Sequence, residues 1–475
     1  MGSSHQGDPL SLADADAETL AALGFEEPAA TAAALREAAA FPELAPFARP
    51  LVDALLSSAR PAFGAHALTE LALARRHAGA PLDLARTPWL PALLGNSSAL
   101  ARTLLRHPDW ADELAGDPPA PPPDAPVPAD WDEIRAAKYR GLLRVAARDL
   151  ARRPFEQSFA ELSDLADRCL RAALACAAQE LGAAPPALLA LGKLGGRELN
   201  FSSDVDLLFV YDVAASADPL DAQQETARLI QHLKARLEQP ADDGFGYRVD
   251  LNLRPEGRAG VLANPVDAAL TYYEAFGAEW ERQMLIRLRA VAGPPEPAAR
   301  FAAGIVPFVY RSLIGPDVMR GMREMKARIE RERRAAGRDL DADLKEGPGG
   351  IRDVEFLVQA FQLFYGARFP ELRTGNVLEA LRVLGLEELL PADVIRSLCD
   401  AYLWLRRAEH ALQLADERQT QRVPARPAAR VELARRMGYR EPRAADALKR
   451  FEGDWSAVRG EVRSHFEALV LGGDA

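Results

Sequence analysis

Short apolar runs between long helical stretches divide the chain into three regions. Up to about residue 115 and from about residue 297 onward, the sequence is rich in Ala, Leu, Arg and Glu, and apolar residues recur at helical spacing. Between these stretches, Ala187–Leu191 and Asp204–Tyr211 are short runs of strand-forming residues. The pattern predicts an α+β, mostly helical protein in which a small mixed β-sheet is flanked by helical regions.

Helical periodicity and proline content set the predicted boundaries. The Pro-rich segment Gly116–Pro128 is typical of an extended linker. We therefore predict a helical region at 1–130 that ends in this linker, a domain containing the sheet at 131–296, and a helical bundle domain at 297–475. The helices predicted with the clearest spacing are Trp131–Arg152, Phe155–Leu181, Pro219–Gln239, Val354–Tyr365, Asp393–Asp416 and Val431–Leu471.

A third strand is predicted from strict alternation in Gly244–Arg254. One set of alternate side chains is apolar and the other is polar, the pattern of a strand with one buried face. On this prediction Arg248, Asp250, Asn252 and Arg254 all point to the polar face.

Composition narrows the class of protein. With 475 residues, the chain is expected to form two or three domains, and its 48% hydrophobic content is ordinary for a globular protein. No apolar run is long enough to cross a membrane, and Met1–Pro9 lacks the apolar core of a signal peptide. The 3 cysteines are sparse, which is typical of reduced thiols in the cytoplasm, and the formal net charge of −11 does not favour nucleic acid as a partner.

Two carboxylates at the start of a predicted strand are the first candidates for chemistry. Asp204 and Asp206 are two residues apart, so they project from the same face. Carboxylates this close repel each other unless a cation or a proton separates them, and oxygen ligands suit Mg²⁺ or Mn²⁺. Taken alone, such a pair is more often a solvated strand end.

A third acid, Asp250, lies on the polar face of the other strand. Three carboxylates from adjacent strands can hold two metal ions, which activate a nucleophile and stabilise a leaving oxygen at phosphorus. The sequence therefore predicts Asp204, Asp206 and Asp250 as catalytic metal ligands for two Mg²⁺ or Mn²⁺ ions.

Residues around the acids are candidates for nucleotide or phosphate binding. Gly195 and Gly196 can let the backbone approach a phosphate closely, and the hydroxyl of Ser203 can hold one of its oxygens. Lys193 and Arg254 can neutralise phosphate charge. A plain turn and exposed surface charges are the alternatives.

Four sequence blocks, Leu191–Phe209, Tyr247–Pro255, Glu279–Arg282 and Gly349–Phe356, resemble in the same order the glutamine synthetase adenylyltransferase/adenylyl-removing family. The resemblance covers roughly Trp131–Val423. It implies a nucleotidyltransferase domain of the DNA polymerase β type, followed by a helical bundle, with the three aspartates as metal ligands. It also implies that Lys345–Phe356 forms a wall of the active site. For Glu281 and Arg282, a role behind the metal ligands and a structural ion pair are both open.

Family members usually carry two such halves, one attaching AMP to a tyrosine of glutamine synthetase and one removing it, whereas this chain carries one. Its Leu199–Ser203 and Gly349–Arg352 segments are similar to the adenylyl-removing half. The resemblance thus implies phosphorolysis of adenylylated glutamine synthetase by inorganic phosphate, giving ADP. It also implies control by a PII-type signalling protein. The alternatives are ATP-dependent AMP attachment and a catalytically silent regulatory module.

Overall fold

The computed structural model describes residues 11–116, 128–150, 154–213, 218–311, 328, 331–332, 334–335, 337 and 339–471. The predicted linker lies almost entirely outside these residues. Within them, the predicted class is confirmed: the chain is mostly helical and has a small mixed sheet of five strands. None of the described helices combines the length and the apolar character that a membrane crossing requires.

The chain divides into two compact units that are discontinuous in sequence. Unit 1 contains Met1–Ala120, Leu142–Phe155 and Arg407–Ser456, and unit 2 contains Pro121–Gly141, Glu156–Arg406 and Ala457–Ala475. The domain boundaries expected at residues 130 and 296 stay a prediction, because compactness alone does not test them.

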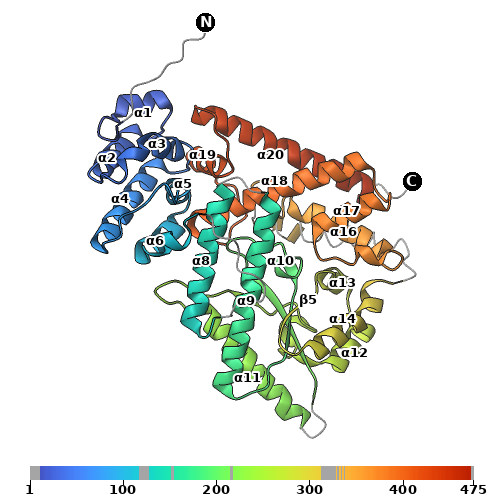
Figure 1. The fold of residues 1–475 in the computed structure, drawn as a ribbon. Helices are drawn as coiled ribbons and strands as arrows, with labels where there is room; N and C mark the ends of the chain where they lie inside the picture. Colours follow the sequence, from blue (N-terminus) through green and yellow to red (C-terminus); the bar gives the residue numbers. More distant parts are fainter. Residues whose placement is uncertain are drawn as a thin grey trace. The chain divides into compact units, whose positions relative to one another are not determined.

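Unit 1 is helical in its described part (Figure 1). Two glycines let two of its helices touch: a Cβ at Gly64 would lie 2.7 Å from the Cα of Gly95, so the backbones of α4 and α5 are in direct contact. Its helices are α1 (Ala17–Leu23), α2 (Pro28–Ala38), α3 (Ala48–Leu56), α4 (Pro61–His77), α5 (Leu90–Asn96), α6 (Ser98–Arg106), α7 (Trp110–Glu113) and α19 (Pro427–Arg436), together with the C-terminal parts of α8 (Trp131–Leu150) and α18 (Ala392–Asp416) and most of α20 (Ala444–Phe466).

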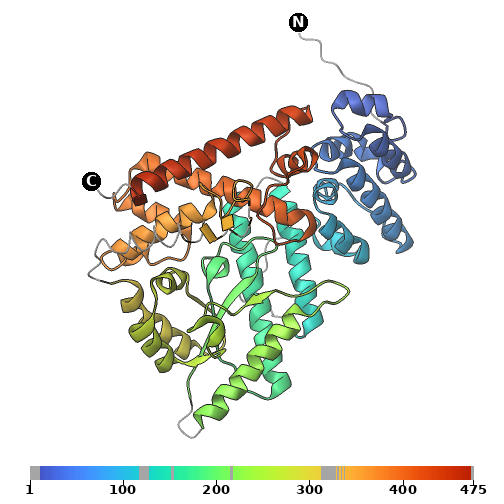
Figure 2. The same ribbon diagram turned by 180° about the vertical axis from the view of Figure 1, so that it is seen from behind.

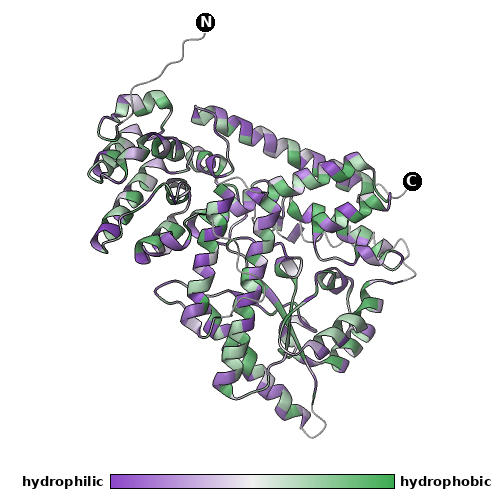
Figure 3. Ribbon diagram, in the orientation of Figure 1, coloured by the Kyte–Doolittle hydropathy of each residue, from purple (hydrophilic) through white to green (hydrophobic). Residues whose placement is uncertain are grey.

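Unit 2 contains the sheet. Its strands are β1 (Ala187–Ala190), β2 (Val205–Tyr211), β3 (Val249–Asp250), β4 (Asn264–Pro265) and β5 (Arg289–Ala292). β1 pairs antiparallel with β2 and β5, whereas β3 and β4 pair parallel with β2. β1 is buried along its whole length, and so is β2 except at Asp206. This burial agrees with their hydrophobic colouring in Figure 3.

Helices pack on the sheet through one apolar cluster that includes Leu189, Leu208, Tyr273 and Phe301. Figures 1 and 2 show α12 and α14 beside the sheet in both views. Because Leu208 and Val210 belong to the cluster, the alternate residue Asp206 lies at the end of the same face. The helices of unit 2 are α9 (Phe155–Leu181), α10 (Gly192–Gly195), α11 (Pro219–Glu238), α12 (Val266–Phe276), α13 (Glu279–Leu285), α14 (Pro295–Val309), α16 (Ile351–Tyr365) and α17 (Val377–Leu386), with the first parts of α8 and α18 and the end of α20.

The end of α20 belongs to unit 2, where Arg459 binds the turn at Pro348 and Gly349. Arg459 Nε donates to the Pro348 carbonyl at 2.9 Å, and Arg459 Nη1 donates to the Asp341 carbonyl at 2.7 Å. A Cβ at Gly349 would lie 2.2 Å from the Arg459 carbonyl oxygen, so the turn and the helix are in backbone contact.

The long strand predicted for Gly244–Arg254 is wrong in its extent, because only Val249 and Asp250 are paired as a strand. On the outer side of β3, Glu238 accepts from Val249 N at 2.9 Å, and Lys234 Nζ donates to the Val249 carbonyl. Side chains of α11 thus satisfy the backbone groups that a further strand would use. The single helix predicted at Val431–Leu471 is also wrong, since it is two helices, α19 and α20.

Candidate active site

Two of the three predicted carboxylates are neighbours across the sheet. β2 and β3 run parallel, with Val205 opposite Val249 and Asp206 opposite Asp250. Directly paired residues project from the same face, so the Asp206 and Asp250 side chains share it. Asp204 precedes β2 by one residue, two positions before Asp206.

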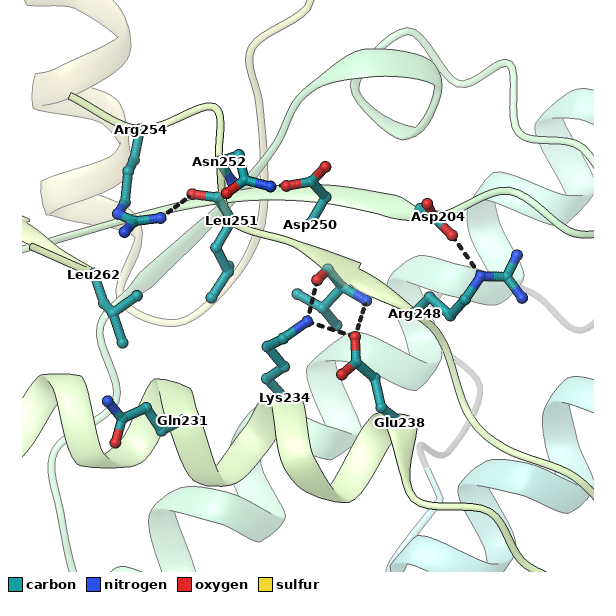
Figure 4. Close-up of a pocket in the computed structure, with 11 residues that line it drawn as sticks. Asp204, Gln231, Lys234, Glu238, Arg248, Asp250, Leu251, Asn252, Arg254 and Leu262 are labelled. Carbon is teal, nitrogen blue, oxygen red and sulfur yellow. Dashed lines mark hydrogen bonds and ion pairs between the residues drawn. The ribbon is translucent and has the colours of Figure 1, made fainter. Parts of the chain in front are cut away.

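Asp204 is held by an arginine on the neighbouring strand segment. Arg248 Nε donates to Asp204 Oδ1 at 2.6 Å (Figure 4). Arg248 Nη2 donates to the Ser202 carbonyl at 2.7 Å. The Arg248 carbonyl in turn accepts from Val205 N at 2.9 Å. Backbone and side chain of Arg248 therefore both fix the start of β2.

Burial and charged neighbours shift the pKa of Asp206. Burial, then the negative charge of Asp250, raises the pKa of Asp206 from 3.8 to about 6, and Asp204 adds to this. Lys345 and Lys193 act in the opposite direction, so both cations lie within electrostatic reach. Burial and the neighbouring acids together outweigh these two cations, so the pKa of Asp206 is raised.

Gly192 makes room for the Asp206 carboxylate. A Cβ at Gly192 would lie 2.0 Å from Asp206 Oδ2, and its φ of +54° is itself unfavourable for other residues. Gly192 was not among the site residues predicted from the sequence. Its position two residues after β1 was visible, but its approach to Asp206 depends on the pairing of β1 with β2.

Crowded oxygen donors on one rigid face fit a hard divalent cation. The Ser203 hydroxyl also fits a ligand nearby, because its oxygen is buried without a hydrogen-bond partner among the described residues. However, no group of three or more His, Cys, Asp or Glu side chains in the described chain is placed to hold an ion as it stands. Asp204 keeps its ion pair with Arg248 instead. The set of three ligands therefore stays a prediction.

Gly195 and Gly196 pack closely against backbone atoms of other segments of unit 2. Gly195 N donates to the Leu191 carbonyl at 2.9 Å and Gly196 N donates to the Gly192 carbonyl at 3.2 Å. A Cβ at Gly195 would lie 1.8 Å from the Arg287 carbonyl oxygen, and one at Gly196 would lie 2.5 Å from the Gly375 carbonyl oxygen. Both N–H groups are already bonded, so phosphate binding by this pair stays an untested prediction.

Replacement of Gly195 by alanine is expected to destabilise the protein by about 2–3 kcal/mol, because the added methyl group would meet backbone atoms that cannot rotate away. Urea unfolding followed by circular dichroism measures this. Gly385→Ala in α17 is the matched control: its nearest neighbour would be Ile395 Cγ1 at 3.5 Å, and alanine favours helix by about 1 kcal/mol. Equal stability of the two variants would contradict the packing role.

The guanidinium of Arg254 is bonded to backbone carbonyls and is not presented to the carboxylates. Its guanidinium donates to the Leu251 carbonyl at 2.6 Å and to the Gly260 carbonyl at 2.9 and 3.0 Å. The side chain is buried, which breaks the predicted alternation of the strand. Arg254 therefore fastens the 251–260 loop, and its predicted role in binding phosphate stays untested.

An open pocket of about 710 Å³ lies beside Asp204 and Asp250, between α11 and β3 (Figure 4). Lys234, one of its cations, is bonded to Glu238 at 2.5 Å. The pocket gives these two carboxylates access to solvent. It is lined by Asp204, Gln231, Lys234, Glu238, Arg248, Val249, Asp250, Leu251, Asn252, Arg254 and Leu262.

A buried ionic network behind the site was missed from sequence. Arg287 Nη2 lies 3.4 Å from Glu198 Oε2 and 3.1 Å from Glu355 Oε1. Arg406, on α18, is fully buried and donates to the Glu198 carbonyl and, at 2.9 Å, to Asn200 Oδ1. The network joins the Gly192–Asn200 segment to α16 and α18.

The pKa values of the two acids in this network shift in opposite directions. Burial raises the pKa of Glu198. Burial also acts to raise the pKa of Glu355, but the positive charges of Arg287 and Lys345 outweigh it, so this pKa is lowered. Glu355 is thus the firmly ionised partner of Arg287. The sequence signal for both acids was only that they stand inside the blocks of family resemblance.

Glu281 and Arg282 are buried within the helical side of the core. Glu281 Oε2 accepts from Ala278 N at 2.7 Å, which caps α13, and Arg282 lies 3.3 Å from Glu279. These contacts favour the structural alternative for both residues.

Two protein families match the sequence. The family described as glutamate-ammonia ligase adenylyltransferase matches residues 89–304, and the one described as GlnD PII-uridylyltransferase matches residues 323–470. The two matches fall on either side of residues 305–322. They cover the sheet with its carboxylates and the C-terminal helices, respectively.

Curated relatives named bifunctional glutamine synthetase adenylyltransferase/adenylyl-removing enzyme extend the match. The one from Thioalkalivibrio sulfidiphilus is 37% identical over 89% of this chain and 46% of its own length. The one from Stenotrophomonas maltophilia strain R551-3 is 39% identical over 82% and 43%, and the one from Nitrosococcus oceani is 38% identical over 71% and 36%. The chain therefore spans about half the length of these relatives, or less.

Proposed function

This chain belongs to the family of glutamine synthetase adenylyltransferase/adenylyl-removing enzymes, and we propose that it removes AMP from adenylylated glutamine synthetase by phosphorolysis. The observation that supports this most is the register of β2 and β3, which sets Asp206 beside Asp250 with Asp204 two residues away. Paired acids on a rigid sheet can hold the metal ions that assist displacement at phosphorus.

The reaction requires no nucleophilic side chain. An oxygen of hydrogen phosphate forms a bond to the α-phosphorus, the bond from phosphorus to the tyrosine oxygen breaks, and the proton of the phosphate ends on that tyrosine. The products are ADP and unmodified glutamine synthetase. The protein's task is to hold both anions in line and to compensate their charge.

Asp204, Asp206 and Asp250 would hold Mg²⁺ or Mn²⁺, in one or two ions. Such ions supply Lewis-acid stabilisation of the phosphoryl oxygens. Lys193, whose charge acts on Asp206, and the buried hydroxyl of Ser203 are the residues we propose for phosphate binding. Gly192 keeps Asp206 on the substrate side by leaving the space that its carboxylate occupies.

The direction of the reaction rests on the similarity of Leu199–Ser203 and Gly349–Arg352 to the adenylyl-removing half. ATP-dependent AMP attachment is the second candidate, since the relatives are named for both activities. The match to a PII-uridylyltransferase family is consistent with regulation by a PII-type protein. We place the activity in the cytoplasm, in keeping with the three free cysteines.

Purified chain given adenylylated glutamine synthetase, inorganic phosphate and Mg²⁺ is expected to release ADP and unmodified glutamine synthetase, detected by ³¹P NMR and mass spectrometry. Without phosphate, the bond should persist. The reverse assay supplies unmodified glutamine synthetase and labelled ATP. AMP attachment without phosphate-dependent ADP release would reverse the assigned direction, and inactivity in both assays together with a lack of Mg²⁺ or Mn²⁺ binding would favour the regulatory module.

A further inference from the structure

The guanidinium group of Arg248 is fixed by three neighbouring groups. Its Nε donates to Asp204 Oδ1 at 2.6 Å, and its Nη2 donates to the Ser202 carbonyl at 2.7 Å and to the Ser202 hydroxyl at 3.2 Å. Its Cζ lies over the ring of Phe245, 5.3 Å from the ring centroid. These contacts hold the planar group in one orientation, so it is prepared for a ligand in advance.

The third nitrogen of this group, Nη1, makes no hydrogen bond or ion pair within the part of the chain that the structure describes. Arg248 lines the open pocket beside Asp204 and Asp250, and its side chain is 34% exposed (Figure 4). A guanidinium carries five N–H donors, two of them on Nη1. Two donors of Arg248 are therefore left for an acceptor at this end of the pocket.

The other two cations that line the pocket are already bonded. Lys234 Nζ donates to Glu238 Oε1 at 2.5 Å and to the Val249 carbonyl. The guanidinium of Arg254 donates through all three of its nitrogens to carbonyl oxygens of its own loop. Among the described residues of the pocket lining, Arg248 is therefore the one cation with a nitrogen left for an anionic ligand.

The place of Arg248 along the strands indicates which anion it meets. Asp206 lies directly opposite Asp250 in the parallel pair of β2 and β3. Arg248 binds Asp204, and these two residues each precede one of the paired acids by two positions, or about 7 Å of strand. A phosphoryl group that reacts at the Asp206–Asp250 pair therefore leaves Arg248 beside the next anion along the strands.

We propose that Arg248 binds, through Nη1, the inorganic phosphate that attacks the tyrosyl-AMP bond, while its Nε stays bonded to Asp204. The attacking phosphate and the AMP group are both anions, so their approach requires a cation that is held in place. Arg248 reduces the repulsion between them and orients the phosphate oxygen that forms the new bond to phosphorus. This inference rests on the proposed function, since it names the residue that holds its second substrate.

The kinetic test compares Arg248→Met with Arg236→Met in the full chain. Arg236 is a matched control: its side chain is 35% exposed, lies 3.8 Å from the acid Glu180 and faces the ring of Trp131 at 5.0 Å, but it is outside the pocket lining. In Arg248→Met, the KM for inorganic phosphate should rise about 30-fold, because a hydrogen bond between charged groups is lost. The KM for adenylylated glutamine synthetase should change less than about threefold. Arg236→Met should match the parent in both.

Calorimetric titration with ADP and with AMP, in Mg²⁺, identifies which phosphate Arg248 contacts. The β-phosphate of ADP is the former inorganic phosphate, whereas AMP contains only the transferred group. Arg248→Met should weaken ADP binding about 30-fold and AMP binding less than about threefold. Mn²⁺ binding, followed by electron paramagnetic resonance without nucleotide, should be unchanged or tighter because a nearby positive charge is lost. If Arg248→Met does not fold, Arg248→Lys, which keeps a charge without the forked donors, should still weaken ADP binding about tenfold.

ADP binding within about threefold of the parent in Arg248→Met would overturn the proposal. An equal loss for ADP and AMP would also overturn it, because the contact would then be to the transferred group. Equal loss of both nucleotides together with weaker Mn²⁺ binding would reduce Arg248 to a positioning residue for Asp204.

Failure of the proposed function is recognised separately, because the titrations require no turnover. If the parent chain attaches AMP from ATP instead, Arg248→Met should raise the KM for ATP, whose β-phosphate takes the same place. If the parent has neither activity, the ADP and AMP titrations decide alone. A parent that binds neither nucleotide overturns both the proposed function and the role of Arg248.

Discussion

Replacement of Asp206 by asparagine is expected to lower the activity at least about 1000-fold while making the metal-free protein more stable. The parent carboxylate is held beside Asp250 and is partly buried, which raises its pKa to about 6. Asparagine has a similar shape, carries no charge and is a poorer ligand for a hard cation. Activity and stability should therefore move in opposite directions.

The size and pH dependence of the stabilisation follow from this pKa. A shift from 3.8 to about 6 corresponds to about 3 kcal/mol, and partial exposure reduces it, so we expect about 1–2 kcal/mol at pH 8. The folded state holds the proton more tightly than the unfolded state. The parent therefore loses stability as pH rises from about 4 to about 6 and shows no further change from this group above that.

Thermal melts of parent and Asp206→Asn at pH 5 and pH 8, in EDTA, measure this difference. Asp212→Asn is the control, since Asp212 follows the same strand but is exposed and paired with Arg300 at 2.6 Å; it should retain activity. An Asp206→Asn protein that stays within about tenfold of the parent in activity would remove Asp206 from the metal ligands. A lower melting temperature at pH 8 would contradict the electrostatic account.

Replacement of Arg287 by methionine is expected to destabilise unit 2 by about 3–5 kcal/mol, because it leaves the buried acid Glu198 and the largely buried acid Glu355 without their shared cation. Guanidinium unfolding measures the change. The effect should shrink at low pH, where the two acids can take up protons. The pKa of Glu198 is already raised by burial, so this acid is protonated first.

Arg300→Met is the matched control for this prediction. Arg300 also bridges two acids, Asp212 at 2.6 Å and Asp267 at 2.7 Å, but its side chain is 48% exposed. A solvated pair contributes about 0–1 kcal/mol, so this variant should unfold almost like the parent. If the two arginine variants lose similar stability, burial does not determine the value of the Arg287 bridge.

The spacing of apolar residues and the composition were sufficient to predict the elements that form from local sequence. β1, β2, α9 and α11 occur within a residue or two of their predicted positions, because each follows its own apolar spacing. β3 was predicted too long because alternation does not reveal what supplies the outer hydrogen bonds. Here Lys234 and Glu238 of α11 supply them, and the sequence pattern of β3 contains no sign of this.

The site was predictable only as far as it is local. Asp204 and Asp206 were recognisable from their spacing, and alternation placed Asp250 on a polar face. The packing of Gly195 on Arg287 and the bridge from Glu198 to Glu355 join residues that are about 70–160 positions apart in sequence. Charged residues are normally exposed, so sequence alone gave no reason to bury them.

The return of Arg459 to the turn at Pro348 and Gly349 has a consequence for synthesis on the ribosome. The carboxylate strands are complete once residue 250 has left the exit tunnel, but the turn beside Lys345 receives its clamp only after residue 459 has followed. A contact over 111 positions closes late in a chain that emerges from its N-terminus. The strands that carry the three acids are therefore synthesised well before the turn at Pro348 and Gly349 can be fastened, so these two parts of unit 2 mature in a fixed temporal order.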